Sequence, residues 1–136
     1  MEGTKMREVE FRGKPIEDYG GDAKWFYGSA VVNYEDKLAY IEAPGYGCVP
    51  VECETVGQYI GQKDKYGKKI YEGDLFYWRN TLRQVVYRGD KAAFMAKRVQ
   101  GKSNNDFYFY MWNLQDLLDR VEVIGNTYEN PEFLRN

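Results

Sequence analysis

Most of the chain alternates apolar and polar residues with a period of two, which is typical of β-strands buried on one face. Glycine, proline, asparagine and aspartate separate the alternating stretches and mark turns between them. Pro50 places its own strand at a sheet edge, because proline cannot donate a hydrogen bond to a neighbouring strand. The pattern predicts short strands over residues 6–12, 25–32, 37–42, 48–51, 56–60, 75–78, 82–87, 92–98, 107–112 and 121–124.

Two glycines within this pattern predict particular backbone features. Gly28 interrupts an otherwise β-branched and aromatic strand, which indicates a bulge or the close approach of another backbone segment. The run Asp64-Lys65-Tyr66-Gly67 fits a tight turn in which Gly67 supplies a positive φ angle.

One segment changes from period two to the spacing of a helix. Its apolar residues follow the i, i+3, i+4, i+7 pattern of a helix face: Leu114, Leu117, Leu118 and Val121. Asn113 stands at the N-cap position, and Asp116 lies in the first turn, where the helix dipole favours a negative charge. The sequence therefore predicts one short helix over residues 113–120.

The predicted elements are short antiparallel strands with one short helix and no βαβ spacing. They indicate a mostly β, α+β fold with a small, partly open barrel in the second half. We expect an N-terminal β-rich lobe over residues 1–60 and a C-terminal barrel lobe with the helix over residues 61–136, although the two could form one compact unit. A chain of 136 residues buries enough surface to fold without a disulfide or a metal.

The sequence contains no histidine. It therefore lacks the usual general base near neutral pH, the commonest metal ligand and the partner of serine or cysteine in catalytic dyads. Cys48 and Cys53 could form a disulfide, but two reduced thiols in a cytosolic protein fit the pattern better. We expect no enzymatic activity, no cofactor and no metal.

The chain carries no sequence signal for a membrane or for export. The first residues are charged and lack the apolar core of a signal peptide, and no stretch approaches the ~20 apolar residues that span a bilayer. We expect a cytoplasmic protein with no membrane partner.

Charge is distributed unevenly along the chain, although the net charge is only −2. Residues 1–60 carry 6 Lys or Arg against 11 Asp or Glu, whereas residues 79–102 carry 7 cations against the single carboxylate of Asp90. Residues 103–136 are acidic again, with 2 cations against 6 carboxylates. Such asymmetry indicates an acidic ligand or head-to-tail contact between copies of the chain.

The basic segment and the aromatic run after it form the only constellation that resembles a binding site. In a strand over residues 107–112, the three rings of Tyr108, Tyr110 and Trp112 would share one face. Cations neutralise phosphates and exposed rings stack bases. The candidate surface for an anionic ligand or a partner comprises Arg79, Arg83, Arg88, Lys91, Lys97, Arg98, Lys102, Tyr108, Tyr110 and Trp112.

The alternative interpretation is a solvated sheet face whose cations pair with acidic strands while the rings lie in the core. The sequence pI of about 5.3 favours this alternative, because nucleic-acid-binding domains are typically far more basic.

Two smaller patterns are better explained by structure than by chemistry. Glu72 and Asp74 flank Gly73 and could bind a cation or act as acid and base, but aspartate beside glycine at a strand start more often accepts hydrogen bonds from turn amides. Gly57, Gly61 and the following glycines lack both the Gly-Lys-Ser/Thr ending and the helix of a phosphate-binding loop.

Four segments together resemble a known family. They are MREVEFRGK at residues 6–14, WFYGS at 25–29, the stretch from Thr55 to Asp74, and EVIGNTYENP at 122–131. In this order they resemble the YopX-like family, which is encoded by phages and prophages. The resemblance implies a β-rich protein whose C-terminal lobe is similar to an SH3-like barrel, and it supplies no catalytic residues.

Some positions depart from the family pattern: residues 1–5 extend the usual start, residues 18–22 lengthen a loop, and Tyr66 stands where asparagine is more usual. The basic segment falls in the variable region of the family. The chain is therefore expected to be a non-enzymatic accessory protein that binds itself as a homo-oligomer or binds another phage or host protein. The alternative is a nucleic-acid-binding module that uses the basic segment 79–102 and the aromatic face 108–112.

Overall fold

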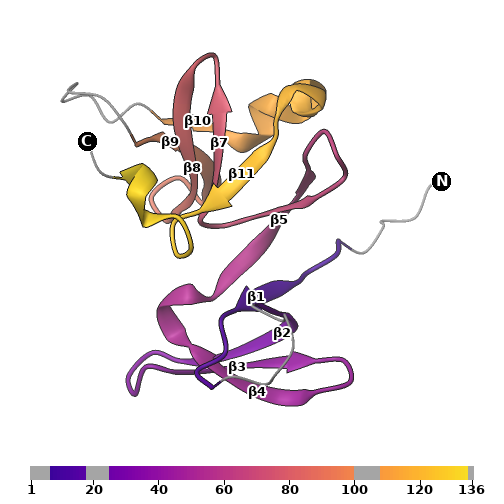
Figure 1. Cartoon of the computed structure of the whole chain (residues 1–136), viewed down its shortest axis with the longest axis vertical. Helices are drawn as coiled ribbons and strands as arrows, with labels where there is room; N and C mark the ends of the chain where they lie inside the picture. The colour runs from indigo at the N-terminus through magenta and orange to yellow at the C-terminus, as the bar shows by residue number, and fades with distance from the viewer. Residues whose placement is uncertain (1–6, 18–24, 100–107, 135–136) are drawn as a thin grey trace. The chain divides into compact units, whose positions relative to one another are not determined.

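The computed structural model describes residues 7–17, 25–99 and 108–134 (Figure 1). The chain divides into two compact units, Met1–Gly61 and Gln62–Asn136. The architecture is mostly antiparallel β, with a half-barrel sheet and almost no helix. Within the described ranges the helical segments are all 3₁₀ turns: η1 (Cys53–Thr55), η2 (Met111–Arg120) and η3 (Pro131–Leu134).

The first of the two sheets has six strands in the order β4-β3-β2-β1-β5-β6. Its strands are β1 (Phe11–Gly13), β2 (Phe26–Asn33), β3 (Leu38–Ala43), β4 (Gly47–Glu52), β5 (Gly57–Lys63) and β6 (Lys69–Tyr71). The unit boundary falls within β5, so the end of β5 and all of β6 belong to the second unit. β2 and β3 pair as a hairpin, and the predicted edge position of the Pro50 strand is confirmed.

Strand alternation gives the first unit its core. Ala39, Ile41 and Ala43 of β3 are buried, whereas Leu38, Tyr40 and Glu42 between them are exposed. The buried cluster joins one face of three strands: Phe26, Ala39, Ile41, Ala43, Val49 and Val51.

Gly28 allows a close approach of two backbone segments, as the sequence predicted. A Cβ at this position would overlap the carbonyl oxygen of Glu42 on β3. The hairpin can therefore pair in its observed register only with glycine here.

The predicted strand over residues 6–12 is much shorter in the structure. Only Phe11–Gly13 pair, with β2 on one side and β5 on the other. Val9 precedes the strand and is exposed.

The second unit contains a five-stranded antiparallel sheet with the strand order β10-β9-β8-β7-β11. The strands are β7 (Asp74–Trp78), β8 (Thr81–Arg88), β9 (Ala93–Arg98), β10 (Tyr108–Tyr110) and β11 (Val123–Asn126). The first four form a meander, and β11 returns to pair with β7. Leu75 and Phe76 of β7 are fully buried at the centre of this unit.

The predicted helix over residues 113–120 is wrong in type and in start. The structure forms a 3₁₀ helix, η2, over Met111–Arg120, so Asn113 is not its N-cap. With about three residues per turn, a 3₁₀ helix aligns Met111, Leu114 and Leu117 on one side. Met111 and Leu114 are buried. Because the helix starts at Met111, it buries the side chain of this residue, which the predicted helix did not include.

The carboxylate of Asp64 connects the start of the second unit to its last strand. Asp64 is 7% exposed. Its Oδ1 accepts hydrogen bonds from the backbone N–H groups of Tyr66 and Lys68, each at 2.9 Å, and its Oδ2 accepts one from Val123 of β11 at 3.0 Å. The predicted turn is confirmed, with φ of 79° at Gly67.

Replacing Asp64 with alanine is expected to lower the free energy of unfolding by about 3 kcal/mol, because three amides lose a charged acceptor. Denaturant-induced unfolding measures this loss. The matched control is Asp90→Ala, which removes an exposed carboxylate and is expected to cost at most about 1 kcal/mol. Equal losses in the two variants would contradict the role assigned to Asp64.

Candidate functional site

The cations of β8 and β9 are divided between the two faces of the sheet. Arg83 lies directly opposite Arg98, and Gln84 lies opposite Lys97. Because side chains alternate along a strand, Arg83 and Arg98 share one face, while Arg88 and Lys97 share the other. The sequence could not separate these two groups.

The face of Arg83 is largely closed to solvent. Arg83 is 7% exposed, and its guanidinium carbon lies 4.8 Å from the ring centroid of Phe109. Burial lowers the pKa of the Arg83 guanidinium, and the positive charge of Arg98 lowers it further. Arginine nevertheless keeps its charge in proteins, so Arg83 is a buried cation packed on an aromatic ring rather than a surface group.

On the opposite face, Arg88 both covers a ring and pairs with a carboxylate. Its guanidinium carbon lies 4.5 Å from the ring centroid of Tyr108. Its Nε and Nη2 donate hydrogen bonds to the two carboxylate oxygens of Asp90, at 3.0 and 2.9 Å. Tyr108 in turn lies opposite Lys97 in the register of β10 and β9.

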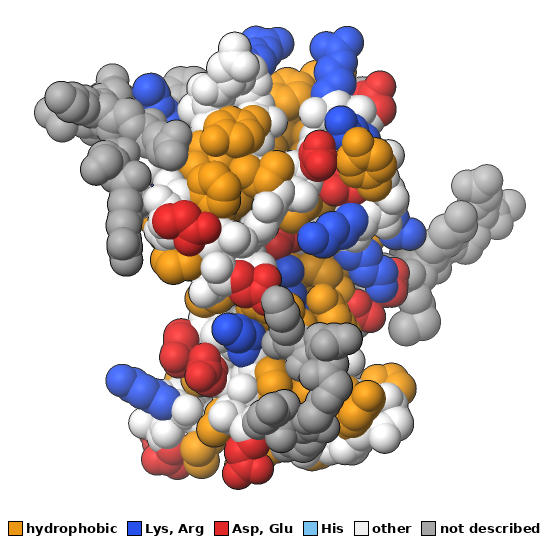
Figure 2. Space-filling view, viewed as in Figure 1, with side chains coloured by type: hydrophobic (Ala, Val, Ile, Leu, Met, Phe, Trp, Pro, Cys, Tyr) orange, Lys and Arg blue, Asp and Glu red, His pale blue; other side chains and the backbone are white. Residues whose placement is uncertain are grey.

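Tyr110 and Trp112 extend this face beyond the end of β10. Their rings are stacked, with centroids 5.3 Å apart and planes inclined by 29°. Trp112 is 62% exposed, so its outer ring face is open to solvent. We call Arg88, Lys97, Tyr108, Tyr110 and Trp112 the basic-aromatic surface. Figure 2 shows hydrophobic side chains in orange gathering over the second unit, with both blue cations and red carboxylates near them.

Two of the remaining predicted site residues, Arg79 and Lys91, lie in turns of the sheet. Arg79 occupies the turn between β7 and β8 with φ of 50°, and its guanidinium carbon lies 5.7 Å from the ring of Trp78. Lys91 is exposed in the turn between β8 and β9. Lys102 lies outside the described residues.

The structural interpretation of Asp74 is confirmed. Asp74 is 1% exposed, and its Oδ2 accepts a hydrogen bond from the N–H of Tyr71 at 2.8 Å. The carboxylate therefore holds the turn between β6 and β7. In the part of the chain that the structure describes, no three His, Cys, Asp or Glu side chains gather to hold a metal. Cys48 and Cys53 are free thiols.

The first unit carries an exposed apolar patch that the sequence analysis missed. The register places Val31, Tyr40 and Pro50 in one row across β2, β3 and β4, with Leu38 beside Tyr40 on the same face. Val31 is 65% exposed, Leu38 47% and Tyr40 38%. We call these four residues the apolar sheet face.

Acidic side chains border the apolar sheet face. Glu52 lies opposite Leu38, and Glu42 lies between Ser29 and Cys48. On this face, the nine positions at which β2, β3 and β4 pair include two glutamates and no lysine or arginine: Asn33, Leu38, Glu52, Val31, Tyr40, Pro50, Ser29, Glu42 and Cys48. This face could not be predicted from the sequence, because residues 38–43 carry apolar side chains on both faces of the strand.

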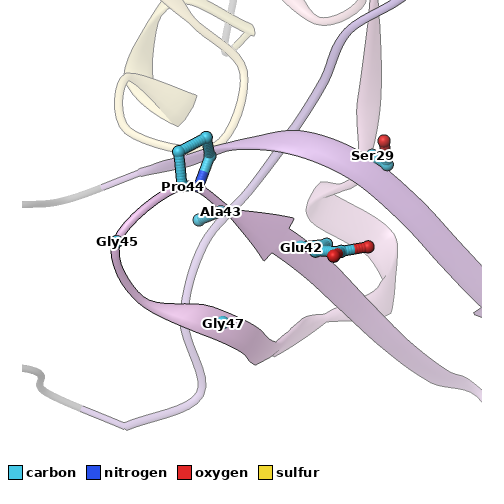
Figure 3. A pocket seen from close by; sticks show the side chains of 6 residues that line it. All are labelled: Ser29, Glu42, Ala43, Pro44, Gly45 and Gly47. Carbon is cyan, nitrogen blue, oxygen red and sulfur yellow. The ribbon is translucent and has the colours of Figure 1, made fainter.

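An open hollow of about 470 Å³ lies at the acidic end of the same sheet (Figure 3). Ser29 of β2 and Glu42 of β3 line it together with the β3–β4 turn of Pro44, Gly45 and Gly47. The hollow offers one carboxylate and one hydroxyl, so it extends the acidic border of the sheet face.

The fold and its surfaces define a small, mostly antiparallel β-protein with two chemically different exposed faces. The sequence model of the YopX protein family matches residues 28–135, so the chain belongs to this family. No curated protein matches the chain. None of the helices in the described ranges is long and apolar enough to cross a membrane.

The stacked ring of Trp112 is expected to contribute little to folding. Trp112→Ala should lower the free energy of unfolding by no more than about 1 kcal/mol, because only a solvent-exposed stacking contact with Tyr110 is lost. Thermal unfolding followed by circular dichroism measures the change. A loss as large as that of a buried aromatic residue would show that Trp112 is part of the core.

Proposed function

We propose that this chain is a phage or prophage accessory protein that acts through protein contacts as a homo-oligomer, without catalysing a reaction. The observation that carries the proposal is the apolar sheet face. An antiparallel sheet face turned toward water normally carries polar side chains, and a contiguous exposed apolar patch marks an interaction site. The resemblance to phage-encoded proteins supports the biological setting, a bacterial host cytoplasm.

We also propose that the second unit is SH3-like. Four strands, β7 to β10, form a meander, and the 3₁₀ segment η2 then leads into β11. β11 pairs with β7, the first strand of the meander. SH3-like barrels use this order of connections, and because such a fold hosts many unrelated functions, the likeness concerns the fold alone.

Self-association is the direct test of the oligomer. Size-exclusion chromatography with light scattering, from low to high micromolar concentration, is expected to give a mass that rises above the 16.0 kDa of one chain. Val31→Glu is expected to lower that mass, because it places a charge in the middle of the apolar sheet face. A monomeric mass at every concentration would overturn the proposal.

A second candidate function is nucleic-acid binding by the basic-aromatic surface. The open face of Trp112 favours it, together with Lys97 and Arg88 at Tyr108 on the same surface, because single strands bind where cations meet exposed rings. The ion pair of Arg88 with Asp90 opposes it, since Asp90 already neutralises a cation that a phosphate would need.

Fluorescence anisotropy with labelled single-stranded DNA and RNA at two salt concentrations tests this candidate. Binding should weaken as salt rises, and Trp112→Ala should cost about 1–3 kcal/mol of binding free energy. Lys97→Glu should weaken binding strongly, whereas Lys37→Glu in the β2–β3 turn is the control and should change it little. Identical affinities in all three variants would show that the basic-aromatic surface does not bind nucleic acid.

A further inference from the structure

We infer that the apolar sheet face of one copy receives the basic-aromatic surface of a second copy, so that the chain associates head to tail. This inference rests on the proposed homo-oligomer and names its contact. The apolar sheet face exposes apolar side chains to water, and the basic-aromatic surface carries rings and cations that could cover it.

The apolar sheet face supplies the centre of the contact. Val31, Tyr40 and Pro50 form a continuous row across three strands, and Leu38 widens it. Stable interfaces have an apolar centre from which charged residues are depleted, inside a polar rim. This face has that arrangement, because its carboxylates, Glu42 and Glu52, lie in the rows on either side of the central one.

The charges on the apolar sheet face indicate which kind of partner binds there. The nine paired positions of the face hold two carboxylates and no cation, so an occupant with cations around an apolar centre is favoured. The same chain carries such a surface. Lys97 lies opposite Tyr108, and Arg88 covers the ring of Tyr108 while it pairs with Asp90. Tyr110 and Trp112 stack at the end of the same surface. A second copy therefore provides a complementary partner.

The aromatic side chains suit the role of anchors. Tyrosine and tryptophan are enriched among the residues that dominate binding energy, because each buries a large rigid area at a low entropic cost. Trp112 is 62% exposed and stacked on Tyr110, so its ring is held in place before any contact forms. Its open side can pack on Tyr40 and Pro50 of the other copy while Lys97 meets Glu42 or Glu52.

The two surfaces differ, so each contact joins unlike surfaces. Repeated from copy to copy, such a head-to-tail contact generates closed rings or open chains. This property gives the inference a sharp test, because two variants that each lack one surface can still pair with each other.

The experiment uses Val31→Glu, which disables the apolar sheet face, and Trp112→Glu, which disables the basic-aromatic surface. Each variant alone is expected to be monomeric by light scattering at concentrations where the wild-type chain is oligomeric. Mixed in equal amounts, they should form a 1:1 pair and nothing larger. Tyr66→Glu is the matched control, since Tyr66 is a 72% exposed tyrosine outside both surfaces, and it should leave assembly unchanged.

The thiol of Cys48 provides a second measurement in the intact assembly. Cys48 is exposed and lies on the same face as Glu42, opposite it in the register of β3 and β4. In a Cys53→Ser background, the rate at which a thiol reagent modifies Cys48 should fall several-fold as the protein assembles. An unchanged rate in a demonstrably oligomeric sample would overturn the inferred contact.

The outcomes separate this inference from the proposed function. If the wild-type chain stays monomeric, the proposed homo-oligomer is wrong. If both Val31→Glu and Trp112→Glu still form oligomers, the proposed homo-oligomer stands and the inferred contact between the two surfaces is wrong. Association of either variant with itself would show that like surfaces meet. Unfolding transitions check that each variant is folded, and Tyr40→Glu replaces Val31→Glu if the latter is not.

Discussion

The second unit depends on one buried carboxylate, that of Asp64. It accepts hydrogen bonds from two amides of its own turn and from Val123 of β11, so it fixes where the last strand can lie. β11 pairs with β7, and β7 begins the meander that carries the basic-aromatic surface. A charge taken out of water is tolerable only with such full hydrogen bonding. Asp74 plays a similar part at the start of β7, where it holds the preceding turn.

Strand register decides which side chains can act together. Neighbouring cations in the sequence, such as Lys97 and Arg98, end on opposite faces, and only one of them joins Tyr108. Arg83 shares a buried face with Phe109 and has its pKa lowered by burial and by Arg98. The segment that is strongly basic in the sequence therefore contributes to two chemically distinct surfaces in the fold, and on one of them Arg83 is buried.

Sequence patterns predicted the features that local interactions determine. The turn at Gly67, the close approach at Gly28 and the cap by Asp74 depend on backbone conformation within a few residues or on the absence of a side chain. The helix type at Met111–Arg120 was wrong because leucines at i, i+3 and i+4 fit both helix types, and burial of Met111 decides between them. The apolar sheet face could not be predicted, since Leu38 and Ile41 are equally apolar and only the positions of other strands decide which is covered.

The return of β11 to β7 also has a consequence for synthesis of the chain. In the first unit, β2, β3 and β4 pair with their immediate neighbours in the sequence, so these hairpins can form as soon as they leave the ribosome. In the second unit, the hydrogen bond from Val123 to Asp64 joins residues 59 positions apart. The edge of β7 therefore stays open, and the carboxylate of Asp64 lacks its third donor, until nearly the whole chain has been translated.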